Sequence, residues 1–147
     1  MSKMLVSDWK EIKFFKPTEN WGEWEKIESN LIYMLDIFRE RIATPIYVSC
    51  GTQGRHSPNS YHYSGHAVDV LFPNKLMPDL VELSQQAKDM NFGGVGIYNN
   101  WDFHGVSTPG MHLDVRNGKQ KLWIGIDGIY LPYNDVNLKR YFTDFKP

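Results

Sequence analysis

The chain has 147 residues, the length of one ordinary domain that can bury a hydrophobic core without disulfides. A formal net charge of -1 argues against a nucleic-acid binder that relies on a basic surface, and no apolar stretch approaches the length of a membrane span. The amino-terminal residues also lack the hydrophobic core of a secretory signal. We therefore expect one monomeric domain over residues 1–147, made in the cytoplasm, with no nucleic-acid or membrane partner.

The first forty residues predict an arm followed by a long helix. Residues 1–17 are expected to form an amino-terminal arm whose aromatic side chains Trp9, Phe14 and Phe15 pack back onto the domain. From about Trp21 to Ile42, aromatic and aliphatic residues recur at helical spacing, which predicts one amphipathic helix. That apolar stripe is typical of a core-facing helix surface rather than of a cofactor pocket.

The middle of the chain predicts two strands and a second helix. Apolar, β-branched runs predict strands from Pro45 to Cys50 and from His66 to Phe72, with a loop between them. Pro78 suits the first turn of a helix from Met77 to Asn91. Cys50 is the single cysteine and has no partner for an internal disulfide, so we interpret it as a buried small apolar residue rather than a nucleophile.

The last third of the chain predicts further strands. One strand is expected near Gly94 to Tyr98, then a loop through Pro109, then a strand from Met111 to Arg116. Asn117-Gly118 is a strong tight-turn signal, which predicts that this strand pairs with another from Lys121 to Ile126. The tail that follows carries turn and aromatic signals that fit a short hairpin and a closing helical turn. The expected fold class is α+β, with helices packed on a largely antiparallel sheet.

The ten residues from Ser60 to Asp69 carry the clearest chemical signal. They place His62 and Asp69 seven positions apart, and His112 follows later in Met-His-Leu-Asp. Gly65 permits a tight backbone approach between the first two. Asp69 lies in an apolar run, where a carboxylate is costly to bury unless it is paired or coordinates a cation. Two imidazoles and one carboxylate make a complete protein ligand set for a hydrolytic zinc ion, which keeps its fourth position for water.

Five residues of this segment match a family signature. Ser60, His62, Gly65, Ala67 and Asp69 reproduce the pattern S-x-H-x-x-G-x-A-x-D. In this respect the chain resembles the zinc D-Ala-D-Ala carboxypeptidase family, which also holds other peptidoglycan peptidases and the amino-terminal hedgehog signalling domain. The resemblance extends over most of the chain and implies a hedgehog/DD-peptidase-like fold.

The resemblance implies an activity and a cofactor. With His62, Asp69 and His112 as zinc ligands, the expected protein is a metallopeptidase that hydrolyses peptide bonds in peptidoglycan stem peptides or cross-links, as a carboxypeptidase or an endopeptidase. Because no export signal is seen, such an endolysin-like enzyme would reach the cell wall through lysis, a phage particle or a specialised route. The alternative is a catalytically inactive zinc-bound recognition domain that binds a cell-wall peptide or a protein partner.

The family pattern leaves the substrate-binding group open. Many members carry an arginine in the turn where this chain has Gln53. Arg55 lies two residues on and is the candidate to bind a substrate carboxylate or polarise the scissile carbonyl. The competing interpretation of Arg55 is an ordinary surface arginine.

The general base is the second open position. Many members place an acid or a histidine two or three positions before the last ligand, where this chain has Pro109 and Gly110. Asp114 shares a strand face with His112, so we predict that it acts as the catalytic base or orients a ligand imidazole. The competing interpretation of Asp114 is an ion pair with Arg116 or a lysine.

Three further polar residues are assigned structural positions. His66 lies three positions before Asp69, an odd offset, so it faces the opposite side of the strand and is interpreted as structural. Asp102 and His104 fall in the expected loop before Pro109, where a solvated position accounts for both, although such a loop could also form a cleft rim.

Overall fold

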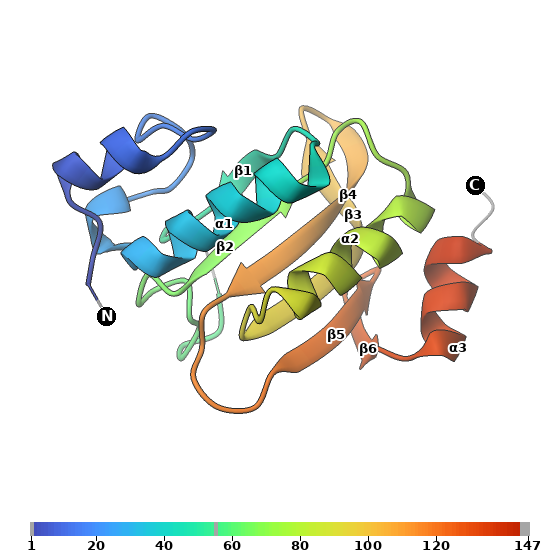
Figure 1. Cartoon of the computed structure of the whole chain (residues 1–147). Coiled ribbons are helices and arrows are strands. Elements are labelled where there is room, and N and C mark those ends of the chain that lie inside the picture. The colour runs from blue at the N-terminus through green and yellow to red at the C-terminus, as the bar shows by residue number, and fades with distance from the viewer. Residues whose placement is uncertain (1, 55, 145–147) are drawn as a thin grey trace.

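The computed structural model describes residues 2–54 and 56–144, which form a six-stranded sheet with helices packed against it (Figure 1). The strand order is β1-β2-β4-β3-β5-β6, and neighbouring strands are antiparallel except β3 and β5, which are parallel. The expected mixed α+β class is therefore confirmed. The strands are β1 (Tyr47–Cys50), β2 (Ala67–Leu71), β3 (Gly94–Phe103), β4 (Val106–Asp114), β5 (Lys121–Ile126) and β6 (Ile129–Pro132).

Helices α1 (Ser29–Ile42) and α2 (Met77–Asp89) lie on the same face of the sheet (Figure 1). Alternate residues of the central strands point to that face and form the hydrophobic core with the helices. The intervening residues point to the other face, which leaves the polar side chains of β2 and β4 on the side of the sheet away from the helices. The core residues of the central strands β2 to β5 are Val68, Val70, Val95, Ile97, Met111, Leu113 and Ile124, and Val48 of β1 joins the same core.

The helix expected from Trp21 is shorter than predicted, because α1 begins at Ser29. Ile27 and Glu28 are extended instead, since their backbone groups bond to distant segments. The Ile27 carbonyl accepts a hydrogen bond from the amino-terminal arm at 2.8 Å, and the Glu28 N–H donates to the carbonyl of Gly65 at 2.9 Å. The helical spacing of apolar residues carries no information about such long-range backbone bonds. The prediction was therefore wrong at the amino-terminal end of α1.

The loop expected through Pro109 is a β-hairpin. β3 and β4 pair up to a turn at His104 and Gly105, whose φ angles of 51° and 84° are left-handed. The ladder shifts register between Tyr98 and Trp101. The loop prediction was wrong because the asparagines in this stretch look like turn residues, although they lie on a strand.

The hairpin predicted from Asn117-Gly118 does not form. β4 is bonded on one side to β2 and on the other to β3, so neither of its edges is free for β5. The chain instead crosses the end of β3 and returns parallel to it, with Lys121 N–H donating to the Gly93 carbonyl at 2.9 Å. Gly118 does lie in a turn, with φ 88°, but that turn belongs to a crossover.

The two ends of the chain largely follow expectation. Trp9 packs against the rings of Trp21 and Trp24, and Phe15 is buried. Phe14 is 40% exposed, and its ring lies against the guanidinium of Arg39 in α1. The tail forms the β5–β6 hairpin and then α3 (Asp135–Leu138), which continues into a helical turn. Within residues 2–54 and 56–144, no helix is both long enough and apolar enough to span a membrane.

Candidate metal centre

The candidate site lies on the sheet face away from α1 and α2. Asp69 of β2 is the direct partner of His112 of β4, and directly paired residues point to the same side of a sheet. His62 lies on the loop before β2, which folds back so that its imidazole meets the same carboxylate. His62, Asp69 and His112 thus converge into a group that could hold a metal ion.

The donor atoms are spaced for one shared ion. Asp69 Oδ1 lies 3.2 Å from His62 Nε2 and 3.2 Å from His112 Nδ1. Ligand atoms that surround a tetrahedral zinc ion at about 2.0 to 2.2 Å lie roughly 3.3 to 3.5 Å from one another. Two of the three separations therefore already match a shared ion, and all three ligand atoms lie within 4.8 Å of one another.

The His62 tautomer is set by the loop after β1. His62 Nδ1 lies 2.9 Å from the carbonyl oxygen of Gly51, which can only accept a hydrogen bond, so Nδ1 carries the proton. The lone pair is therefore on Nε2, the nitrogen that faces Asp69. A backbone carbonyl on the outer nitrogen is a common way of orienting a metal-binding imidazole.

Asp114 performs the same task for His112. Its Oδ2 lies 2.7 Å from His112 Nε2, and the other ring nitrogen faces Asp69. Asp114 is fully buried and also accepts hydrogen bonds from the guanidinium of Arg116. Asp114 therefore makes both contacts considered for it, the hydrogen bond that orients His112 and the ion pair with Arg116. It lies behind the imidazole, so we favour the orienting role over that of general base.

Gly94 and Gly65 make room for this arrangement. A Cβ at Gly94 would lie 2.2 Å from Asp114 Oδ2, so a side chain there would displace the buried carboxylate. Gly65 has a φ of 77°, and a Cβ there would lie 1.8 Å from the carbonyl of Lys26. The backbone does approach closely at Gly65, as expected. The approach is to Lys26, however, so it joins the loop that carries His62 to the segment before α1 and not His62 to Asp69.

The three side chains lie in an open cleft of about 790 Å³. Trp123 packs beside His112, with ring centroids 5.0 Å apart, and the stacked rings of Tyr98 and Trp101 form part of the wall. The remaining lining residues are polar or aromatic: His56, Ser57, Ser60, Arg116, Lys121 and Tyr130.

Sequence reasoning missed His56 and expected Cys50 to be more deeply buried than it is. Cys50 is partly buried, and its Sγ lies 3.4 Å from His56 Nε2. Burial, reinforced by the charge of Asp69, raises the pKa of the Cys50 thiol to about 12. The His-Ser-Pro-Asn stretch resembles an ordinary surface loop, so only the spatial contact identifies His56.

The other predicted site residues take different positions. Arg55 lies outside the described residues. Gln53 is used internally, with its amide bonded to the carbonyl of Asn20 and the N–H of Gly51. Asp102 and His104 line a separate small pocket at the hairpin tip.

His66 is outside the cleft lining. Its Nδ1 lies 2.7 Å from the hydroxyl of Ser64, and its Nε2 faces the carboxylate of Glu28. These contacts fit the structural role expected for it.

The charged groups of the metal centre shift one another's pKa values. Burial alone raises the pKa of Asp69, but hydrogen bonds from His112 and His62 outweigh it and lower the pKa to about 2. Burial lowers the pKa of His112, whereas its bonds to Asp114 and Asp69 raise it above its ordinary value. A metal ion that binds here must displace a proton from His112, so metal affinity should fall as the pH is lowered.

The pKa of Asp69 predicts an acid-dependent stability of the metal-free chain. A carboxyl whose folded pKa lies near 2 and whose ordinary value is 3.8 stabilises the fold above about pH 4 and loses that contribution as the pH falls through about 2. The contribution is of order 2 kcal/mol. In urea unfolding of chelated protein, Asp69→Asn should be less stable than the parent at pH 6 and indistinguishable from it near pH 2. A constant difference at every pH would contradict this.

Comparison with known proteins leaves the family open. A search against protein-family models found no match, and a search of curated proteins found none either. The functional interpretation therefore depends on the residues described above.

Proposed function

We propose that the chain is a zinc-dependent peptidase that hydrolyses peptide bonds in peptidoglycan. The observation that carries the proposal is the convergence of His62 Nε2, His112 Nδ1 and the Asp69 carboxylate in an open cleft. Two imidazoles and one carboxylate are a ligand set of hydrolytic zinc sites, in which the fourth position is left for water. The S-x-H-x-x-G-x-A-x-D pattern supports the substrate class, through its resemblance to D-Ala-D-Ala carboxypeptidases.

The surrounding residues prepare the site for hydrolysis. A zinc ion held by the three side chains would supply a water molecule of near-neutral pKa and polarise the scissile carbonyl. The Gly51 carbonyl and the Asp114 carboxylate hold the two imidazoles with their lone pairs toward the centre. The indole ring of Trp123 packs beside the His112 imidazole in the cleft wall.

His56 is the cleft residue best suited to accept a proton from the attacking water. Of the described residues that line the cleft, it is the only histidine outside the set proposed to hold zinc, and histidine is the usual proton-transfer group near neutral pH. Its ring lies flat against that of His62, with centroids 4.0 Å apart, which places it beside the centre. Its Nε2 contacts the Gln53 carbonyl at 2.9 Å, so the loop fixes the ring.

Asp114→Asn separates the orienting role from the role of base. If Asp114 orients His112, the variant should bind zinc about 10- to 100-fold more weakly. Hydrolysis at saturating zinc should then be largely preserved. Zinc affinity measured by competition with a chromophoric chelator, together with the rate at saturating zinc, tests this. Unchanged affinity with a rate loss of about 10²- to 10⁴-fold would instead identify Asp114 as the base.

The function is tested directly with cell-wall substrates. Purified protein is incubated with intact peptidoglycan, with cross-linked muropeptides and with free stem peptides, with and without a zinc chelator, and the products are identified by mass spectrometry. We expect chelator-sensitive release of D-alanine or of separated stem peptides. Chelator-sensitive binding without any product would instead support the inactive recognition domain. The absence of Arg at position 53 favours that second candidate.

A further inference from the structure

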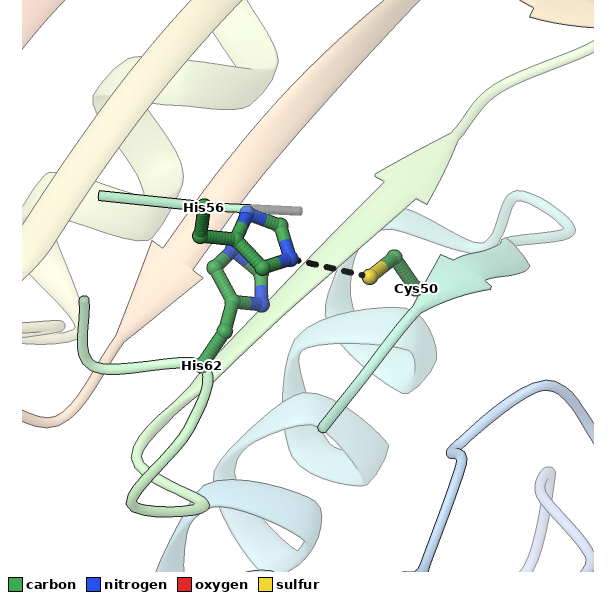
Figure 2. A group of neighbouring side chains, drawn as sticks. All are labelled: Cys50, His56 and His62. Carbon is green, nitrogen blue, oxygen red and sulfur yellow. Dashed lines mark hydrogen bonds between the residues drawn. The ribbon is translucent and has the colours of Figure 1, made fainter. Parts of the chain in front are cut away.

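A second group of metal-binding side chains lies on the wall of the same cleft. Cys50 Sγ lies 3.4 Å from His56 Nε2, and Figure 2 shows the His56 ring stacked over that of His62 with the thiol at its outer edge. The two ring planes are 9° apart. The ligand atoms of Cys50, His56 and His62 are close enough together to hold one ion.

A β-bulge turns Cys50 to this wall. The pairing of β1 with β2 shifts register after Val48, so that Cys50, rather than Ser49, is the partner of Asp69. Partners in a ladder point to the same side, and bulges commonly redirect a side chain in this way. Without the bulge, the alternation of the strand would turn the thiol toward the helices.

We propose that Cys50, His56 and His62 form a second metal site, specific for thiophilic cations. The distance of 3.4 Å between sulfur and nitrogen is close to the roughly 3.5 Å expected when a thiolate at about 2.3 Å and an imidazole at about 2.0 Å share a tetrahedral ion. Both atoms also lie 2.9 Å from the Gln53 carbonyl oxygen, which can only accept hydrogen bonds, so each carries a proton in the metal-free chain. When a cation binds, the proton on the His56 ring must move to Nδ1 so that Nε2 can act as a ligand. The thiol proton is released to solvent when the cation binds.

The two sites are alternatives, because they share His62. The lone pairs of an imidazole lie in its ring plane, so an ion in the plane of His56 lies outside the parallel plane of His62. His62 must turn to reach that ion, and this turn withdraws its Nε2 from Asp69. The first site contains the Asp69 carboxylate and the second contains the Cys50 thiolate, so the two sites prefer different metal ions. The softer cation binds preferentially at the Cys50 site. A cation such as Cd²⁺ at Cys50 would therefore dismantle the zinc site. This inference concerns metal binding and holds with or without peptide hydrolysis.

Cadmium titration of the metal-free full chain tests the proposal. Binding to Cys50 is followed by the ultraviolet charge-transfer absorption of the cadmium–sulfur bond, and total binding by equilibrium dialysis. The parent should develop the band and saturate at one Cd²⁺ per chain. Asp69→Asn should keep the band, because the thiol set does not use that carboxylate. Cys50→Ser should lose the band and still bind one Cd²⁺ through the carboxylate set.

His56→Gln is the decisive variant, with His66→Gln as its matched control. Loss of the imidazole should weaken band formation at least tenfold, whereas the His66 variant should titrate like the parent. Circular dichroism confirms that each variant is folded. Three results would overturn the proposal: no band in the parent, a band that His56→Gln leaves unchanged, or two Cd²⁺ bound per parent chain.

Discussion

Asp69→Ala is expected to abolish zinc retention and to remove the stability that zinc confers. When free zinc is about 1,000 times its Kd, binding to the folded state alone adds about 4 kcal/mol to the free energy of unfolding. The variant should lose all of this. It should also lose the contribution, of order 2 kcal/mol, that the carboxylate makes in the metal-free chain at neutral pH. Urea unfolding of the parent and of Asp69→Ala, each with zinc and with chelator, measures the zinc-dependent and the zinc-independent loss of stability separately.

Asp102→Ala is the matched control for this comparison. Asp102 is an exposed carboxylate of the same sheet, at the tip of the β3–β4 hairpin and outside the cleft lining. Its removal should leave zinc content and the zinc-dependent gain in stability unchanged. If Asp69→Ala lost the same stability with and without zinc, Asp69 would be a structural residue and not a ligand.

The second large effect concerns His56. His56→Gln should retain one zinc per chain and the parent fold, yet hydrolyse a peptidoglycan substrate roughly 10²- to 10⁴-fold more slowly, the usual contribution of general acid-base catalysis.

A control and an opposite outcome define this test. His66→Gln removes a histidine whose bonds are to Ser64 and Glu28, outside the cleft lining, and should leave the rate unchanged. If His56→Gln hydrolysed the substrate at the parent rate, proton transfer would not pass through His56. Asp114 would then be the remaining candidate to accept the proton of the attacking water.

Local patterns predicted the elements of the fold better than their pairing. The β2 strand and helix α2 follow directly from apolar spacing and from Pro78, because these signals depend on neighbouring residues. The path after Asn117-Gly118 could not be predicted in this way. It depends on β2 and β3 having already occupied both edges of β4, which is a property of the whole sheet.

The candidate site divides in the same manner. His62, Asp69 and His112 could be proposed from sequence because their spacing and the buried acid carry the signal. Asp114 was identified from strand alternation, but only the structure places it against the outer nitrogen of His112. His56 left no sequence signal, because its role depends on a stack with His62 across a loop.

The proposal is tested most directly by a crystal structure of the zinc-loaded chain with anomalous scattering recorded at the zinc absorption edge. We predict one ion per chain, within about 2.2 Å of His62 Nε2, His112 Nδ1 and a carboxylate oxygen of Asp69. An ion from which any of these three side chains is turned away, or an ion held by Cys50 and His56 instead, would contradict it.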